Sequence, residues 1–216
     1  MYVTPGQFDW QLGWLASRGY QFCTFGDLSG EDQAAGRRVI ITLDDGYLNN
    51  YQQAFPILKK HGARAVIYPI LSDIGRCAVT WPGATEQSPA DMMTVSQIQE
   101  MSSFGIEFGS HLLHHRRLTD MSETEQLNEL TASKSGLEAL TDRPVLSIAY
   151  PYGDYDEDVV QRTRNAGYRY AVTTDPGSNP SLSDPLRLKR YTAKGCKLYH
   201  PLKFRRMIAE AEKQSG

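Results

Sequence analysis

The sequence predicts an α/β fold with about seven parallel strands, enough to curl into a barrel. Two observations indicate this fold. Short apolar runs rich in β-branched residues alternate with segments in which apolar residues recur at helical spacing. Glycine, proline and capping residues separate most of these segments. This alternation is typical of a parallel sheet whose strands are joined by helical crossovers.

The predicted strands are the short apolar runs. The run at residues 39–43 is rich in β-branched residues, which favours a strand over a helix. A long segment without a clear period, residues 72–93, contains Trp-Pro-Gly and Ser-Pro and predicts a loop. The predicted strands cover residues 20–24, 39–43, 65–70, 106–109, 145–150, 168–173 and 186–192.

Helices are predicted where a capping pattern opens an apolar stripe. Thr4 and Gln7 have capping-box spacing, and the same spacing recurs at residues 94–97 and 122–125. Pro56 is expected to kink the helix that contains it. The predicted helices cover residues 5–19, 48–62, 94–105, 122–140, 156–167 and 201–212.

Composition and charge narrow the classes of protein. The chain has 216 residues and no visible linker, so residues 1–216 are expected to form a single domain. The formal net charge of −2 and the scattered basic residues predict no nucleic-acid partner. We find no apolar stretch of about 18 residues and no signal peptide, so no membrane-spanning segment is expected. Cys23, Cys77 and Cys196 lack the spacing of a disulfide framework or a thiolate metal site.

Two adjacent carboxylates, Asp44 and Asp45, follow the apolar run at residues 39–43 directly. Because neighbouring strand residues point to opposite faces, both carboxylates can reach one site only if the chain bends, and Gly46 permits a bend. Carboxylates at the end of a buried strand need a metal ion, cationic partners or backbone donors. The alternative interpretation is a helix cap, in which an Asp accepts backbone N–H groups.

Three of the five histidines fall within residues 111–115, just after a predicted strand. His111 and His115 are four residues apart, the spacing that places two imidazoles on one side of a helical turn. With one carboxylate they would form a metal site that keeps open positions for water and substrate. Pairs at this spacing also occur as surface residues, and His114 is expected to be exposed or to support the site.

A third segment, residues 150–153, also follows a predicted strand. Its sequence Tyr-Pro-Tyr-Gly is by itself compatible with an ordinary turn. The Asp pair, the histidine segment and this segment therefore all lie past the carboxyl ends of strands. In parallel α/β folds that is the edge where active sites form.

These three segments together resemble the polysaccharide deacetylases, carbohydrate esterase family 4, which is also called the NodB-homology domain. Residues 42–47, T-L-D-D-G-Y, are similar to the family signature T-F-D-D-G. Residues 110–115, S-H-L-L-H-H, are similar to S-H-T-x-x-H, and residues 149–153, A-Y-P-Y-G, resemble a variant third motif. The resemblance covers nearly the whole chain. It implies a distorted (β/α) barrel of about seven parallel strands, a bacterial envelope setting, and a further N-terminal strand before this start.

The resemblance also implies a metal-dependent hydrolase that removes N-acetyl groups from amino sugars of a polysaccharide or glycolipid. Asp45, His111 and His115 would hold one divalent ion, with zinc favoured and cobalt, nickel or iron as alternatives. Asp44 would be the general base, and the backbone N–H of Tyr152 would stabilise the oxyanion. Two aromatic residues are expected to bind the sugar, Tyr152 and Trp81, the latter by stacking from the long loop.

The sequence departs from the family pattern in three places. Leu112 stands where the family prefers Thr or Ser. Ala149 replaces an Arg that orients the base in other branches, and Arg187 or Arg190 is expected to supply a guanidinium instead. The late L-x-x-H motif that supplies the general acid is missing. The candidates for that acid are therefore His114, His200 and the protonated Asp44. These departures leave open a carbohydrate-binding relative without turnover. An O-acetyl esterase that uses the same site is a second alternative, because ester and amide hydrolysis share the tetrahedral intermediate.

Overall fold

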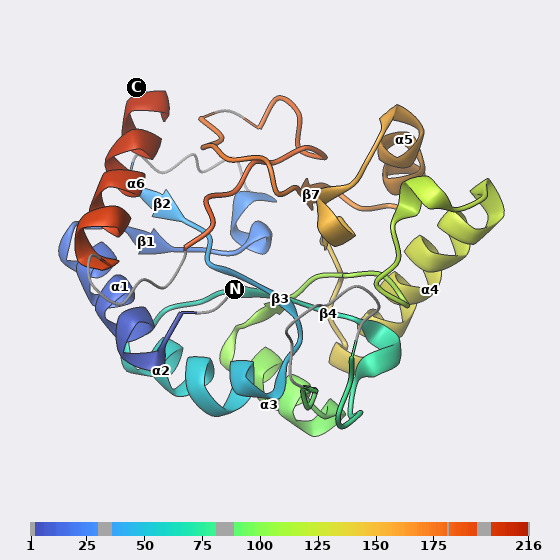
Figure 1. Ribbon diagram of the computed structural model, residues 1–216, viewed down its shortest axis with the longest axis horizontal. Helices are drawn as coiled ribbons and strands as arrows, with labels where there is room; N and C mark the ends of the chain where they lie inside the picture. The colour runs from blue at the N-terminus through green and yellow to red at the C-terminus, as the bar shows by residue number, and fades with distance from the viewer. Residues whose placement is uncertain (1–2, 30–35, 81–88, 181, 194–199, 216) are drawn as a thin grey trace.

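The computed structural model describes residues 3–29, 36–80, 89–180, 182–193 and 200–215. The helices lie outside the strands, and α1 to α5 follow one another around them in chain order (Figure 1). The strands are β1 (Gln21–Phe22), β2 (Arg38–Val39), β3 (Thr42–Asp45), β4 (Val66–Pro69), β5 (Glu107–Phe108), β6 (Ser147–Ala149) and β7 (Tyr170–Val172). The α-helices are α1 (Pro5–Ser17), α2 (Phe55–Lys60), α3 (Val95–Phe104), α4 (Glu123–Thr141), α5 (Glu157–Asn165) and α6 (His200–Ser215).

All the paired strands are parallel, as predicted. They form three short sheets, β1 with β2, β3 with β4 and β5, and β6 with β7. A single parallel bridge from Ser110 to Ile148 joins the segment after β5 to β6. Another, from Val172 to Leu188, adds the segment around Leu188 beside β7. Across the described ranges the strands thus follow chain order but remain divided, and they do not close into one continuous barrel.

Two of the predicted strands are wrong in detail. The run at residues 39–43 is divided, because β2 pairs with β1 whereas β3 changes partner and pairs with β4. The predicted strand at residues 186–192 has only the bridge at Leu188. The reason lies in the next residue, where the side-chain amide of Asn179 bonds both the N–H and the carbonyl of Lys189 and so replaces a strand partner.

The helix predicted at residues 48–62 consists of two pieces. A π-helical turn covers Asn50–Ala54, and α2 follows at Phe55. Pro56 lies in the first turn of α2, where its missing N–H removes no helical bond. The wider π turn lets the Phe55 N–H donate to the Asn50 carbonyl at the junction of the two pieces, and the kink expected at Pro56 stays a prediction.

The three predicted capping boxes are confirmed. At Thr4, Thr94 and Ser122 the hydroxyl accepts the N–H three residues on, and that residue's side chain accepts the N–H of the cap. Gly105 ends α3 in the left-handed conformation at φ 109°, as its position in the sequence predicts.

Aromatic side chains fill the space inside the strands. Tyr68 of β4 is fully buried, and its hydroxyl donates to Ser147 of β6 at 3.2 Å. Gly109 makes room for this ring, because a Cβ at that position would lie 2.3 Å from it. The interior cluster consists of Phe25, Val66, Tyr68, Ala149, Tyr170, Val172 and Leu188.

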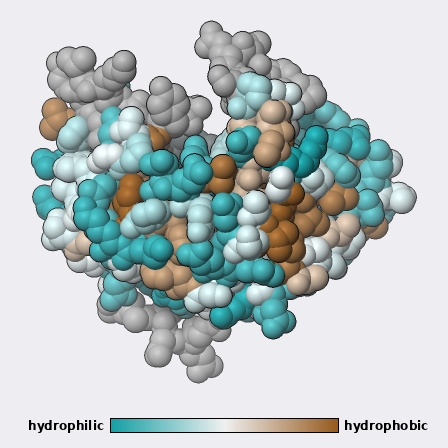
Figure 2. All heavy atoms as spheres, turned by 90° about the horizontal axis from the view of Figure 1, so that it is seen from below, coloured by the Kyte–Doolittle hydropathy of each residue, from teal (hydrophilic) through white to brown (hydrophobic). Residues whose placement is uncertain are grey.

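The surface and the thiols are described for part of the chain. Among the helices that the structure describes, none is both long enough and apolar enough to cross a bilayer. On the face shown in Figure 2, hydrophobic side chains form small patches between hydrophilic ones. Cys23 and Cys77 are free thiols, whereas Cys196 lies outside the described residues.

Candidate active site

The three segments singled out in the sequence meet at the carboxyl edge of the strands. Asp44 and Asp45 end β3, residues 110–115 follow β5, and residues 151–153 follow β6. β3, β4 and β5 are neighbours, and the bridge from Ser110 to Ile148 brings β6 alongside them. The parallel order of the strands therefore places all three segments at one edge.

The bend after β3 separates the two carboxylates. Asp45 has φ 69° and Gly46 has φ 80°, and the Gly46 N–H donates to the Asp44 carbonyl at 2.9 Å. A hydrogen bond across two residues with a positive φ between them is the pattern of a γ-turn, which is rare and strained for a non-glycine residue. A Cβ on Gly46 would lie 2.7 Å from the Cβ of Pro69, so the turn also needs glycine for space. The expected bend is present, and Asp45 shares it with Gly46.

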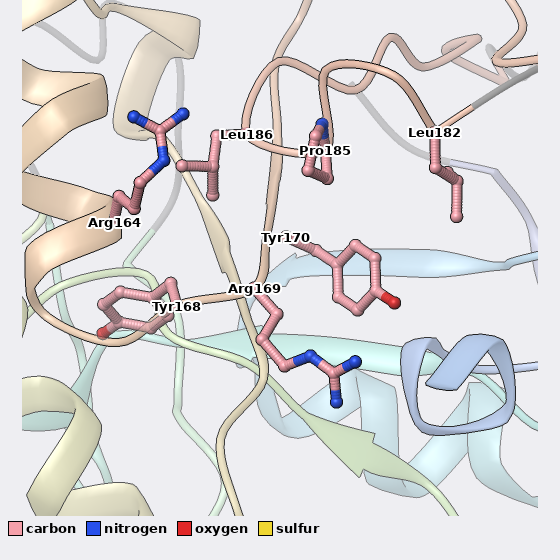
Figure 3. Close-up of a pocket in the computed structure, with 7 residues that line it drawn as sticks. All are labelled: Arg164, Tyr168, Arg169, Tyr170, Leu182, Pro185 and Leu186. Atoms are coloured by element: carbon pink, nitrogen blue, oxygen red, sulfur yellow. The ribbon is translucent and has the colours of Figure 1, made fainter. Parts of the chain in front are cut away.

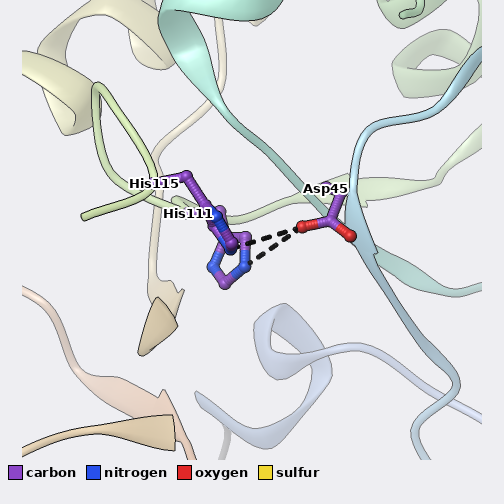
Figure 4. A group of neighbouring side chains, drawn as sticks. All are labelled: Asp45, His111 and His115. Atoms are coloured by element: carbon purple, nitrogen blue, oxygen red, sulfur yellow. Dashed lines mark ion pairs between the residues drawn. The ribbon is translucent and has the colours of Figure 1, made fainter. Parts of the chain in front are cut away.

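Asp45, His111 and His115 converge on one point (Figure 4). The Nε2 atom of each imidazole lies 3.5 Å from Oδ1 of Asp45, and the three candidate ligand atoms lie within 4.8 Å of one another. Three ligands of a tetrahedral zinc ion lie roughly 3.3 Å apart when each is about 2.0–2.1 Å from the metal. The residues therefore fit a divalent ion with only small side-chain adjustments.

The protein fixes the orientation of His111. Its Nδ1 lies 2.7 Å from the carbonyl oxygen of Ala149, so Nδ1–H donates there and Nε2 is the nitrogen that faces Asp45. A backbone carbonyl in this role is common behind metal-binding histidines. His111 is also nearly fully buried, which prevents the ring from turning to solvent.

The electrostatics of the three groups favour a positive charge beside Asp45. Burial lowers the pKa of His115, and the neighbouring His111 lowers it further, to about 4, so His115 is the neutral imidazole that binds metals. Burial also opposes the charged form of His111, but the hydrogen bond to Asp45 and the charges of Asp44 and Asp45 outweigh it and raise the pKa. Burial would raise the pKa of Asp45, yet the two histidines hold it below its usual range.

The histidine segment is not the helical turn that its spacing predicts. Leu112 has φ 67° and His115 has φ 36°, so two non-glycine residues adopt left-handed conformations. The imidazole rings nevertheless lie with their centroids 4.7 Å apart. Leu112 is fully buried in the hydrophobic core, and the irregular turn lets this side chain point inward while both histidines reach the site.

Asp44 is held by an arginine from the far end of the chain. Arg190 donates from Nη1 to Oδ1 of Asp44 at 2.7 Å and from Nη2 to Oδ2 at 2.9 Å. The Nε–H of Arg190 donates to the Thr173 carbonyl at 2.8 Å, which fixes the guanidinium. Arg187 instead bonds Asp184 and Glu157, so of the two arginines expected to replace the one missing at Ala149, Arg190 makes the contact.

Tyr152 presents its ring beside the candidate metal ligands. Its backbone has φ 62°, the residue is 46% exposed, and its ring centroid lies 4.8 Å from that of His115. The guanidinium of Arg117 lies 4.4 Å from the centre of the same ring and bonds Asp154 at 2.9 Å. Arg117 was not expected at the site, because a cation placed over an aromatic ring depends on the folded backbone and leaves no local sequence signal.

A separate pocket lies away from these residues. It has a volume of about 360 Å³ and is lined by residues around the start of β7 and the 182–186 segment (Figure 3). Its lining includes Arg164, Arg169, Tyr170 and Leu182, and none of the converging carboxylates and histidines. Because the chemistry lies at the carboxyl edge of the strands, we place the functional site there and not in this pocket.

A model of the family described as polysaccharide deacetylase matches residues 31–171 of the chain. The chain belongs to the polysaccharide deacetylase family. It is 32% identical over 180 residues to YxkH of Bacillus subtilis, a protein named for the same family, and this match covers 82% of the chain and 60% of YxkH. It is 27% identical over 194 residues to the poly-β-1,6-N-acetyl-D-glucosamine N-deacetylase of Staphylococcus aureus, with 82% of the chain and 64% of that protein covered. The chain thus spans less than two thirds of the length of these relatives.

Two solved structures share the fold. The deacetylase PplD of Streptococcus pyogenes, in complex with acetate, has a TM-score of 0.78 and 27% identity, with 97% of this chain and 87% of that chain covered. IcaB of Ammonifex degensii has a TM-score of 0.79 at 23% identity, with 97% and 90% covered, and supports the fold alone. The predicted fold class, a distorted (β/α) barrel, is therefore confirmed, although the strands of this family member are shorter than predicted.

Of three further residues predicted from the sequence, the structure describes the side chain of only one. Trp81 lies outside the described residues, and so does the side chain of His200. The imidazole of His114 is half exposed, and its Nδ1 lies 2.7 Å from Oε1 of Glu129. The prediction that His114 supports the site or is exposed agrees with this contact, whereas its role as an acid gains no support from it.

Proposed function

We propose that this chain is a metal-dependent hydrolase that removes N-acetyl groups from amino sugars of a polysaccharide or glycolipid, with residues 1–216 as one catalytic domain. One observation carries the proposal. Asp45 converges with two histidines, whereas the adjacent Asp44 is outside that group and is held by a partly buried arginine. A carboxylate beside a metal site, but committed to another partner, is suited to act as a base. The Staphylococcus aureus relative named as an N-acetyl-D-glucosamine polymer deacetylase supports this substrate class.

Asp45, His111 and His115 would hold the ion. Two imidazoles and one carboxylate suit zinc, with cobalt, nickel and iron as alternatives. When bound, such an ion supplies a Lewis acid for the acetamide carbonyl and lowers the pKa of water.

The side chains of this protein then supply the proton transfers. Asp44 accepts a proton from water as the water oxygen bonds to the acetyl carbonyl carbon. Arg190 holds both oxygens of Asp44 and so fixes the direction of this transfer. The N–H of Tyr152 donates to the carbonyl oxygen as that atom gains negative charge.

Breaking the carbon–nitrogen bond releases acetate and an amine that needs one proton. We assign this delivery to Asp44, because it carries the proton taken from water in the previous step. His114, the other described candidate, is bonded to Glu129 on the side of α4. The exposed ring of Tyr152 offers a flat apolar face for the sugar, and Trp81 remains a prediction for a second such contact.

The test is acetate release by the metal-stripped chain with and without added Zn²⁺ or Co²⁺. The substrates are β-1,6-linked and chitin-type N-acetylglucosamine oligomers. We expect metal to restore release and Asp44→Asn to lower it by about 10²- to 10⁴-fold, the usual contribution of a general base. Asp184→Asn is the matched control, because Asp184 is also a carboxylate bonded to an arginine but pairs with Arg187 outside the site.

Each other outcome selects a different interpretation. Acetate released only from O-acetylated xylan would identify an O-acetyl esterase. Stoichiometric metal binding with glycan binding and no release would identify a carbohydrate-binding relative. A chain that binds no divalent ion would refute the metal centre itself.

A further inference from the structure

The loop that carries both candidate histidine ligands has an unfavourable backbone. Leu112 at φ 67° and His115 at φ 36° adopt conformations that non-glycine residues rarely take. Such conformations persist only where the surrounding structure holds them. The positions of His111 and His115 relative to Asp45 therefore depend on whatever fixes the backbone between them.

A buried carboxylate on α4 fixes that backbone. Glu129 is only 3% exposed, and its Oε2 accepts the N–H of Leu113 at 2.9 Å and the N–H of His114 at 3.0 Å. Its other oxygen, Oε1, lies 2.7 Å from Nδ1 of His114. Burying an ionised carboxylate is costly unless its oxygens are bonded, and here all three bonds go to two consecutive residues of the histidine loop.

The same helix also holds the start of the loop. The Leu112 N–H donates to the hydroxyl of Ser110 at 3.0 Å, and that hydroxyl donates to Ser133 at 2.8 Å. Ser133 in turn donates to the carbonyl of Glu129, one helical turn earlier, at 2.6 Å. Ser133 is fully buried, so this part of α4 is enclosed against the loop.

The carbonyl groups of the loop bond in the opposite direction. The Leu71 N–H donates to Leu112 and the Ser72 N–H to Leu113, at 3.1 and 3.0 Å. The loop is thus held between the segment that follows β4 and helix α4. On the α4 side, Glu129 provides the charged contact.

We infer that Glu129 is a positioning residue of the metal centre, which holds the loop in the one conformation where both imidazoles face Asp45. The inference rests on the proposed metal site and goes beyond it, because Glu129 lies behind the ligands and does not itself converge on the ion. Without the carboxylate, two partly buried N–H groups lose their acceptor and the loop relaxes. The ligands then have to be reordered each time a metal ion binds, which weakens its affinity.

The test measures metal affinity and needs no turnover. Calorimetric titration of the metal-stripped chain, residues 1–216, with Zn²⁺ gives the dissociation constant, and the visible spectrum of bound Co²⁺ reports the ligand geometry. Glu129→Ala should weaken Zn²⁺ binding by about 10- to 100-fold, the usual effect of removing a supporting residue behind metal ligands. Glu129→Gln keeps the length and one acceptor but loses the charge, so a smaller loss is expected, on the order of threefold to tenfold.

Gln126→Ala is the matched control. Gln126 is a buried polar residue one turn earlier on α4, and its amide holds the carbonyls of Leu118 and Met121, beyond the histidine loop. It should lower the melting temperature without changing the Zn²⁺ dissociation constant or the Co²⁺ spectrum. If Gln126→Ala weakens Zn²⁺ binding as much as Glu129→Ala does, the cause is general destabilisation and the inference is wrong.

The remaining outcomes show whether the inference, the metal centre or the proposed activity is wrong. Wild-type affinity in Glu129→Ala overturns the inference while leaving the proposed function intact. Where Glu129→Ala fails to fold, wild-type affinity in Glu129→Gln overturns it equally. A wild-type chain that binds no metal refutes the metal centre and this inference together. A wild-type chain that binds metal but releases no acetate refutes only the proposed activity, and the comparison of affinities still applies.

Discussion

The paired hydrogen bonds from Arg190 to Asp44 should control the rate of deacetylation. Both bonds join charged groups, and the side chains of Arg190 and Asp44 are 16% and 33% exposed. A hydrogen bond to a charged group contributes about 1.5–3 kcal/mol, and about 1.4 kcal/mol corresponds to tenfold in rate. Because water can reach Asp44 and replace part of what is lost, we count one bond and not two. Arg190→Met should then lower kcat by roughly 10- to 100-fold.

The effect of Arg190→Met should appear in kcat and not in KM or in metal affinity. The bonds of Arg190 go to Asp44, Thr42 and Thr173, and none goes to the three candidate ligands. Arg190→Lys keeps a charge but loses the two-pronged geometry, so it should fall between Met and the wild type. The assay is steady-state acetate release from N-acetylglucosamine oligomers at saturating Zn²⁺.

Arg187→Met is the control for this experiment. Arg187 lies three residues earlier and pairs with Asp184 and Glu157, so its loss should leave kcat within about twofold. Wild-type kcat in Arg190→Met, with the fold intact by circular dichroism, would refute the argument that the guanidinium orients the base. An equal loss in both variants would attribute the effect to destabilisation of the 186–192 segment.

Three further results are expected. Gly46→Ala should lower the free energy of unfolding by about 1–3 kcal/mol in chemical denaturation and should weaken Zn²⁺ binding. Residue 46 has φ 80°, and its new Cβ would lie 2.7 Å from the Cβ of Pro69. Unchanged stability would show that the turn relaxes. Burial raises the pKa of Glu107, so its contribution to stability is present below the unfolded value, about 4.3, and is lost as pH rises through the raised folded value. The melting temperature of Glu107→Gln relative to the wild type should therefore be higher at pH 7 than at pH 4, and a constant difference would contradict this. Arg117→Ala removes the guanidinium that packs on the Tyr152 ring and leaves that ring less well held, so it should raise KM for oligomers more than it lowers kcat, whereas an effect on kcat alone would exclude a role in sugar binding.

The part of the site that could be predicted from the sequence depends on local patterns. Asp44 and Asp45 follow an apolar β-branched run, and the residues of a parallel strand's carboxyl end must lie at one edge. The capping boxes at Thr4, Thr94 and Ser122 are contacts between residues three apart, so the sequence specifies them almost completely.

The rest depends on contacts between distant residues. The left-handed conformations of Asp45, Leu112 and His115 are imposed by packing and not by residue type, so the helical spacing of the histidines predicted the wrong backbone. In an extended segment, residues three apart point to opposite faces, so only one of Arg187 and Arg190 could reach Asp44. Which of them does so depends on the position of the segment beside β7, which no local pattern reveals.

The contact between Asp44 and Arg190 joins residues 146 positions apart in the chain. A polypeptide is synthesised from its N-terminus, so β3 and the candidate metal ligands exist long before residue 190 does. Contacts between distant residues also form late in folding, because the intervening chain must first be ordered. The base therefore acquires its guanidinium partner only after the 186–192 segment has docked against β7. An incomplete or partly folded chain can hold the three candidate metal ligands and still lack an oriented Asp44, which would tie the proposed hydrolysis to the completion of the fold.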